Sequence, residues 1–596
     1  MRPGNLLRPI AALLIAAAVN PAGAAVRDSA NHDQTEGLTL FDTAAGERID
    51  VEQDRQSAPP VNAPEELVKR IQKGLADQGF YLGPITGRMD RKTEDAIRAY
   101  QASAELPVDG RPTAQLAMDL ETGGKVGQLL NRLEEVRGAS VKAARDALLA
   151  HPETRHLLNE SAQPDAQPRD NAACMAEPEP RCLLLEAAAS ARDIDKPELR
   201  DWALGEILVS QAKAGLAKDA LATTRRIHDP RLVMVALRDI AKAQAVGNRN
   251  DEAQAAAAII PDAQLRAEAY AAIAEVQASR GKAELAVATA ELARPLLDAL
   301  PKMLPRVELH TRLATALHQT GRPHLAAAHM SKARRLVDAI TVHKEKDAAQ
   351  RHIATAYAAQ GDSAKALDVL KNVQNGSDDV PILIAAATGQ ARSGAIDQAL
   401  ITAEGIEAVR YRALVLARIA TLQAEAGNLA QARESLDKAR EAAGNIRFPF
   451  AKAYAFSRVA LAANEMSIGP TPDNALLKRA IDYAHLISDP RLKAQVLWTM
   501  ADARARGGDA QGAADIQDAA NSATRDILSP FSRVWMLCDI AEERAGQAET
   551  AGSWQVFKQA MDEAKTIKNP WGRSRALARV ASTMTVLADR TVQTRN

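Results

Sequence analysis

The sequence has 596 residues, with 75 basic and 75 acidic side chains, so its formal net charge is zero. This length exceeds one ordinary compact domain and indicates several domains or an extended repeat array. A chain without a basic excess is not expected to bind nucleic acid. Aromatic residues are only 3% of the chain and the apolar 46% includes much Ala and Leu, which favours packed helices over strands. Three cysteines are too few for a disulfide scaffold.

Residues 1–24 have the pattern of an export signal. Arg2 and Arg8 precede an apolar run from Ile10 to Val19, and small residues at 22–24 predict cleavage after Ala24. The run is too short to cross a bilayer core, which takes about 20 helical residues. We therefore expect an exported mature chain in the periplasm, without a membrane span. An uncleaved membrane anchor is the alternative.

Composition divides the rest of the chain into five segments. Polar stretches rich in Pro, Asp and Gln predict linkers, and apolar residues at helical spacing predict helices. Leu133 and Val136 are expected on one face of a connecting helix. In chain order we expect a disordered linker (25–63), a compact unit (64–121), connecting helices (122–158), a second linker (159–180) and a long helical array (181–590).

Cys174 lies in the second linker and Cys182 at the start of the helical array that follows it. Export would place both in a compartment that oxidises thiols, which makes a disulfide between them possible. Two free thiols are the alternative, because a sequence does not show geometry. Cys538 sits within a helical pattern and is expected to be a small buried hydrophobic residue.

Residues 64–121 are predicted to form three short helices separated by two glycine-containing turns. The first helix ends at Gly79, the second follows Asp90, and the third carries Leu116 and Leu120. This order resembles the peptidoglycan-binding domain found on many bacterial wall hydrolases. Thr86 departs from the family pattern, which usually has Asp there, and Met89-Asp90 stand where Phe-Gly is frequent. The matching positions are Ile71, Gln72, Leu75, Gly79, Phe80, Gly87, Thr93, Ala96, Ile97, Tyr100, Gln101, Leu106, Asp109 and Gly110.

The resemblance implies noncovalent binding to peptidoglycan. A polymer of sugars and peptides is bound by aromatic faces and a few fixed polar groups. The candidate side chains are Phe80, Tyr81, Arg88, Tyr100 and Gln101. The alternative for Phe80 and Tyr100 is to fill the small core, and for Gln101 to cap a helix.

Between residues 181 and 590, a hydrophobic residue followed by a small one recurs at a spacing of 33 or 40 residues. One spacing is 41 residues. Such a period marks a solenoid of helix pairs. The two spacings differ by seven residues, or two helical turns, so the longer units are expected to lengthen one helix and keep the same packing face. The anchors are Ile207, Ile240, Ile273, Leu313, Ile353, Ala386, Ile419, Val459, Met500, Ile540 and Val580.

Each unit carries similar punctuation. A Pro stands ten residues before the anchor in six units, and a Gly eight residues after it in seven, which predicts a first helix with a defined start and end. The unit from residue 350 has Tyr357, Gly361, Ala366 and Leu370 in an order that resembles the tetratricopeptide repeat. The resemblance implies an all-α superhelix with a concave face that binds proteins or peptides.

A basic residue stands seven positions before the anchor in nine units, near the N-terminus of the first helix. Cations there are disfavoured by the helix dipole by about 0.3–1 kcal/mol. They either pair with carboxylates on adjacent helices or form a basic ladder that meets an acidic partner or the anionic wall. Arg200 is one of them, and the ladder positions singled out for protein binding are Arg266, Arg306, Lys346, Arg412, Lys452, Lys493, Arg533 and Arg573.

Catalytic and metal-binding motifs are not found in the sequence. The nearest histidine clusters are His151 with His156, and His310 with His318, His324 and His329, and neither has the spacing of a zinc site. A serine elbow and a phosphate-binding glycine loop are also missing. We expect no catalytic residue, no metal and no cofactor.

These observations predict a nonenzymatic scaffold or adaptor that is exported to the periplasm. The small unit would anchor it to peptidoglycan, and the helical repeats would recruit or position another envelope protein. Two alternatives remain. One is a wall-lytic enzyme, a muramidase or lytic transglycosylase with a helical solenoid. The other is an activator of a separate wall hydrolase.

Overall fold

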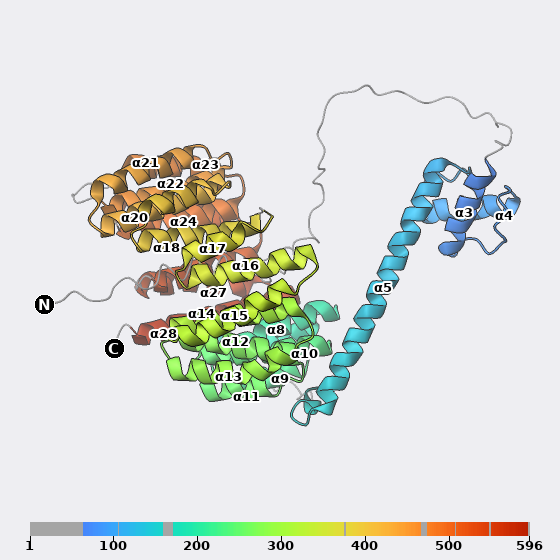
Figure 1. Ribbon diagram of the computed structural model, residues 1–596, viewed down its shortest axis with the longest axis horizontal. Helices are drawn as coiled ribbons and strands as arrows, with labels where there is room; N and C mark the ends of the chain where they lie inside the picture. Colours follow the sequence, from blue (N-terminus) through green and yellow to red (C-terminus); the bar gives the residue numbers. More distant parts are fainter. Residues whose placement is uncertain are drawn as a thin grey trace, which may run out of the picture. The chain divides into compact units, whose positions relative to one another are not determined.

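The computed structural model describes residues 64–593, apart from residues 105, 159–170, 375–376, 467–473, 507 and 547–549. The predicted export signal, the 25–63 linker and most of the 159–180 linker lie outside the described residues. The described chain is helical, with no strand in these ranges, so the predicted all-α class is confirmed. It divides into two compact units, with the boundary along the chain between residues 143 and 144, and each is described below by itself (Figure 1).

The smaller unit contains α3 (Glu65–Asp77), α4 (Arg91–Ser103) and the start of α5 (Ala114–Ala150). The third helix was expected to end near residue 121. Instead it continues through the predicted connecting segment as far as Ala150. Gly123 and Gly124 interrupt the pattern there, and each glycine costs a helix only about 1 kcal/mol, so it continues. Leu133 and Val136 are exposed on α5, at 56% and 62%. Within the described ranges, no helix is long and apolar enough to span a membrane.

The larger unit is a succession of helix pairs, and its first helices carry the predicted anchors. All eleven anchors are buried, with at most 6% of their surface exposed. Each first helix packs against the first helix of the next pair. The first helices are α8 (Pro197–Lys213), α10 (Pro230–Val246), α12 (Ala263–Ser279), α14 (Met303–Gln319), α16 (His343–Ala359), α18 (Val380–Arg392), α20 (Val409–Glu425), α22 (Pro449–Met466), α24 (Pro490–Arg506), α26 (Pro530–Gly546) and α28 (Pro570–Gln593).

The second helices absorb the difference between the two repeat lengths. In the units of 33 residues they have 8 or 9 residues, whereas α13 and α15 in the longer units have 17 and 16. Seven extra residues therefore add two turns to one helix, as the spacing predicted. The second helices are α9 (Ala217–Thr224), α11 (Asn250–Ala258), α13 (Ala283–Ala299), α15 (Pro323–Asp338), α17 (Ser363–Leu370), α19 (Ile396–Glu404), α21 (Leu429–Gly444), α23 (Asn474–His485), α25 (Ala510–Arg525) and α27 (Thr550–Thr566).

The two ends of the array meet. α7 (Pro180–Ser190) packs along α28 as each second helix packs along its own first helix, and α28 also packs against α8. The last helix pair is therefore built from both ends of the array, and the succession of first helices closes on itself. The predicted repeat superhelix is confirmed, and closure is an addition that the period alone did not reveal.

The turns between first and second helices follow the predicted punctuation. The seven glycines eight residues after an anchor all have φ between +72° and +85°, where only glycine is free of strain. In the unit of Ile240 that position is Asn248, with φ +64°, and Asn is the residue that best tolerates this conformation after Gly.

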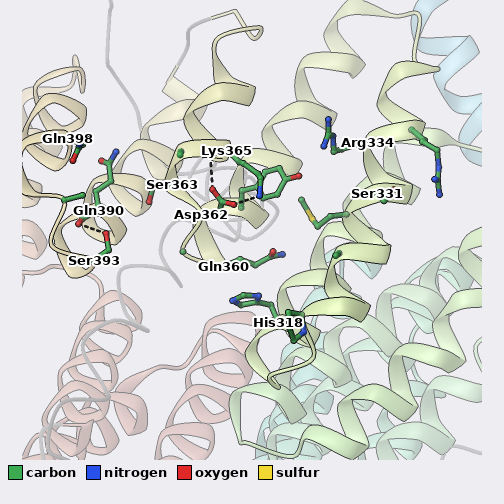
Figure 2. Close-up of a pocket in the computed structure, with 18 of the residues that line it drawn as sticks. His318, Ser331, Arg334, Gln360, Asp362, Ser363, Lys365, Gln390, Ser393 and Gln398 are labelled. Atoms are coloured by element: carbon green, nitrogen blue, oxygen red, sulfur yellow. Dashed lines mark hydrogen bonds and ion pairs between the residues drawn. The ribbon is translucent and has the colours of Figure 1, made fainter.

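One change of helix length leaves a groove. The long α15 is followed by the short α17 and α19, so on that side the later turns of α15 have no second helix of equal length beside them. A cavity of about 1060 Å³ opens between α15, the turn from α16 to α17 and the turn from α18 to α19 (Figure 2).

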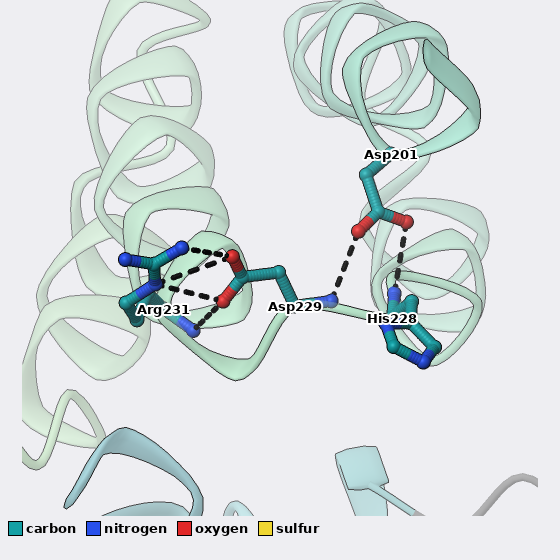
Figure 3. A network of polar contacts seen from close by, with 4 residues as sticks. All are labelled: Asp201, His228, Asp229 and Arg231. Carbon is teal, nitrogen blue, oxygen red and sulfur yellow. Dashed lines mark hydrogen bonds and ion pairs between the residues drawn. The ribbon is translucent and has the colours of Figure 1, made fainter. Parts of the chain in front are cut away.

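Buried polar groups hold successive pairs together. Asp201 in α8 is 3% exposed and accepts hydrogen bonds from the backbone N–H groups of His228 and Asp229, at 2.8 and 2.9 Å, just before α10. Burial raises the pKa of Asp201. Asp229 in turn caps α10 and pairs with Arg231 (Figure 3). This network fixes where the second pair begins.

Candidate functional site

The small unit is built around an apolar core between its three helices. Val68, Ile71 and Leu75 of α3 are fully buried, as are Ile97 of α4 and Leu120 of α5. Their spacing of three or four residues places them on one face of each helix. Because this core is small, the conformation of the two connecting turns depends strongly on polar contacts.

Two buried glutamines hold the turns. In α3, the Gln72 side-chain oxygen accepts hydrogen bonds from the N–H groups of Thr86 and Gly87, at 2.9 and 2.8 Å. In α4, the Gln101 oxygen accepts from Asp109 and Gly110, at 3.1 and 2.9 Å. The turns are thus held to the helices in the same way.

Gly87 is required at the first turn. Its φ is +74°, and a Cβ atom there would lie 2.5 Å from Cγ of Glu65 in α3. The turn therefore presses directly against the first helix, and any side chain at this position would displace it.

Three of the five side chains predicted to bind peptidoglycan lie inside this unit. Tyr81 and Tyr100 are 4% and 9% exposed, and Gln101 is 7% exposed. Tyr81 donates to the carbonyl of Pro84 at 3.1 Å, so its hydroxyl also supports the first turn. Tyr100 therefore packs in the core, as its alternative had it, and Tyr81 does so too, whereas Gln101 holds the second turn and does not cap a helix. Contact of these three side chains with peptidoglycan remains a prediction.

The other two predicted residues are more accessible. Phe80 is half-buried and meets Tyr100 edge to face, with ring centres 5.6 Å apart. Arg88 is exposed in the first turn. Of the five, only Arg88 presents its functional group to solvent, and a contact with peptidoglycan remains a prediction for it.

The first turn also exposes apolar side chains that were not singled out from the sequence. Leu82 is 99% exposed, Ile85 48% and Met89 37%. Together with Arg88 they form what we call the first-turn surface. The sequence could have indicated this surface, because its three apolar residues lie in a glycine-rich turn and belong to no helical repeat of apolar positions. A surface of this kind offers apolar contact to sugar rings and one fixed cation to a carboxylate.

The basic ladder of the repeats has an internal role in several units. All eight ladder side chains are half-buried. Arg412 donates from Nε to the carbonyl of Ile406 at 2.9 Å. Arg533 and Arg573 donate from Nη1 to the carbonyls of Ile527 and Ile567. Arg200 makes the equivalent contact with Ile194. These bonds join the first helix to the connection before it, six residues back, and offset the unfavourable helix dipole.

Fewer of the ladder residues form ion pairs with carboxylates than donate hydrogen bonds to backbone carbonyls. Arg533 also meets Glu563 at 2.7 Å, whereas Lys452 lies 4.9 Å from the ring centre of Tyr483. Contacts with backbone carbonyls were in neither alternative drawn from the sequence, whereas the ion pair of Arg533 is of the kind that the carboxylate alternative expected. Binding of a partner through these residues remains a prediction.

The cysteines and histidines complete the candidate chemistry. Cys174 and Cys182 form a disulfide, and Cys538 is buried, which raises the pKa of its thiol to about 12. His310 and His329 face each other with their Nδ1 atoms 2.9 Å apart. In the part of the chain that the structure describes, no three His, Cys, Asp or Glu residues are grouped to hold a metal ion.

Comparison with known proteins agrees with the resemblance of the small unit. Residues 64–118 match the family described as "Putative peptidoglycan binding domain". The suspected family of this segment is thereby confirmed, and a long helical repeat region follows it. The match ends at residue 118, within α5 of the small unit, and does not include the repeats. A search of curated proteins gave no match.

Two solved structures are similar to part of this chain. The crystal structure of Ton1535 from Thermococcus onnurineus NA1 is 18% identical, covers 55% of this chain and 96% of its own, and superposes with a TM-score of 0.26. A circular tandem repeat protein with novel repeat topology and enhanced subunit contact surfaces is 14% identical, covers 70% and 99%, and has a TM-score of 0.17.

Proposed function

We propose that this protein is an exported, nonenzymatic scaffold that binds peptidoglycan through residues 64–118 and holds another envelope protein through its helical repeats. The family match of that segment carries the proposal. The periplasm is the compartment that fits both a peptidoglycan ligand and the signal-like residues 1–24.

The first-turn surface is the proposed contact with the wall. Gln72 and Tyr81 hold the turn from inside, so Leu82 and Arg88 project from a fixed backbone. Rigid presentation of a few groups reduces the entropy lost on binding. The Arg88 guanidinium would meet a carboxylate of the stem peptides, and Leu82 would cover an apolar face of the polymer.

Cosedimentation with purified sacculi tests this proposal. The chain from residue 25 should pellet with sacculi, and the same chain lacking residues 64–121 should remain in the supernatant. Arg88→Glu combined with Leu82→Asp should reduce the bound fraction about tenfold, since both side chains are exposed and are not needed for the fold. Arg111→Glu, an exposed position in the second turn, is the matched control and should bind normally.

The same incubation separates the enzymatic alternative. A scaffold leaves sacculi intact, so chromatography of the supernatant should show no soluble glycan fragments. Fragments released by the purified chain would contradict the nonenzymatic proposal and favour a lytic enzyme. An activator would release fragments only when a separate hydrolase is added.

A further inference from the structure

The groove beside α15 has an apolar floor. Met330 of α15 and Tyr357 of α16 line it, and they are only 4% and 8% exposed. Ala327 and Ala364 also face it and are small enough to leave its base open. An apolar side chain placed here would therefore be shielded from water on several sides.

One rim of the groove is cationic. Arg334 and Arg335 are exposed on the later turns of α15, and neither has an ion-pair partner among the described residues. Lys365 adds a third cation, 5.6 Å from the ring centre of Tyr357. The acidic lining residues are Asp338 and Asp362, and Asp362 already accepts from Lys365 at 2.7 Å. Figure 2 shows Arg334 and the pair of Lys365 with Asp362 in this lining. With that pair neutral, the free charge of the rim is positive.

The other parts of the lining present side-chain amides. Gln360 follows the last residue of α16, Gln390 lies in α18 and Gln398 in α19, and all three line the groove. Nε2 of Gln360 is buried and donates no hydrogen bond within the described residues. Gln390 uses its side-chain oxygen to accept from Thr402. Amides spaced along a groove suit the alternating donors and acceptors of an extended peptide backbone.

The size of the groove also favours a peptide. Its volume of about 1060 Å³ is at the upper end of the roughly 300–1,000 Å³ common for small-molecule sites. It runs across three successive helix pairs instead of closing into a pit. We propose that this groove binds an extended acidic segment of a partner protein, with carboxylates at Arg334 and Arg335 and an apolar side chain over Met330 and Tyr357.

This inference rests on the proposed scaffold role and names the place and chemistry of the partner. Fluorescence anisotropy with a labelled short peptide of alternating Glu and Leu is the test, using the purified chain. We expect saturable binding that weakens with salt, and no binding of the matched Gln and Leu peptide. Arg334→Glu with Arg335→Glu should weaken binding about tenfold or more.

A matched control lies on another second helix. Lys478 and Arg479 of α23 are also adjacent, exposed cations but do not line the groove. Reversing both to Glu should leave the affinity unchanged. Ala364→Trp should fill the groove floor and abolish binding without changing the net charge. Circular dichroism melting of every variant shows whether the fold is intact.

The outcomes distinguish this inference from the wall-binding proposal. Equal loss in the groove and α23 variants, or equal binding of the Gln and Leu peptide, would overturn the acidic-segment site. Sacculus binding should be the same in all groove variants, because residues 64–118 lie in the other unit. A chain that binds the acidic peptide but not sacculi would contradict the wall-binding role and leave the groove assignment standing.

Discussion

Arg575 in α28 and Glu206 in α8 form two hydrogen bonds of 2.8 Å, although 369 residues separate them in the chain. Four aromatic rings surround the guanidinium at 4.5–5.2 Å, those of Trp202, Phe531, Trp535 and Trp571. Three of the five tryptophans of the sequence thus gather where the two ends of the repeat array meet. The pair fixes the closure of the array.

Replacing Arg575 should weaken that closure. Arg575→Met leaves the Glu206 carboxylate, which is 31% exposed, without its cation and removes the stacking on the rings. We expect a loss of about 2–4 kcal/mol in the free energy of unfolding, measured by guanidinium denaturation with tryptophan fluorescence. Arg440→Met breaks an exposed pair with Asp437 and should cost about 0.5 kcal/mol or less. Equal effects of the two substitutions would argue against a special role of the closure.

Removing α7 should expose α28. Because α7 serves as the second helix of the last pair, deletion of residues 171–193 uncovers one face of α28. Open arrays lose stability from their ends, so amide hydrogen exchange in α28 should accelerate about tenfold or more. Deletion of residues 64–143 removes the other unit and should leave exchange in α28 unchanged. An α28 that stays protected without α7 would refute the shared pair.

The buried histidine pair predicts sensitivity to acid. Burial lowers the pKa of His310 to about 3 and of His329 to about 4, and each is close to the other ring and to Lys332. The unfolded chain binds these protons near pH 6.5 and the folded chain does not, so stability falls as the pH drops below about 6.5. Between pH 7.5 and 5.0 we expect a loss of about 2–4 kcal/mol, measured as a shift of the urea midpoint.

Substitution of the pair separates its contribution from general acid effects. His310→Leu with His329→Leu should flatten the dependence on pH, since neither position then binds a proton. His324→Gln, an exposed position on α15, should retain the profile of the natural chain. A double variant with the natural profile would show that other groups cause the loss.

The small unit allows structural and binding roles to be told apart. Gln101→Leu removes the acceptor for the N–H groups of Asp109 and Gly110, which should cost about 1–3 kcal/mol. Hydrogen exchange in residues 104–113 should rise, and sacculus binding should fall with the fold. Arg88→Glu should reduce sacculus binding without any change in exchange. If Gln101→Leu bound sacculi less well while exchange stayed normal, a direct contact of Gln101 with the wall would be the better explanation.

Much of the repeat architecture could be predicted because its determinants are local. Pro at the start of a first helix and Gly at its end act within one turn, and Ile207 and its ten counterparts are buried as the spacing required. The extra turns of α13 and α15 follow from seven added residues. The order of the helices within each pair can therefore be predicted from the sequence.

The roles of individual side chains were harder to predict, because they depend on contacts between distant elements. Tyr100 and Gln101 match a family pattern, but the pattern does not say whether a residue points inward or outward. Arg412 was correctly placed at a helix start, yet its partner is a backbone carbonyl, which no sequence spacing marks. Likewise, the residues around Glu206 in the sequence give no indication that its partner is Arg575.

The shared helix pair has a consequence for the order in which the protein is made. Among the described helices, α7 and α8 leave the ribosome before the rest of the array, and α28 leaves last. Until α28 is made, the face of α7 that packs on α28 is exposed to solvent, and Trp202 lacks its contacts with Arg575 and Trp571. α7 and α8 therefore remain incompletely packed until the last helix has been synthesised. A chaperone that binds unfolded chains would protect the protein most at these two helices.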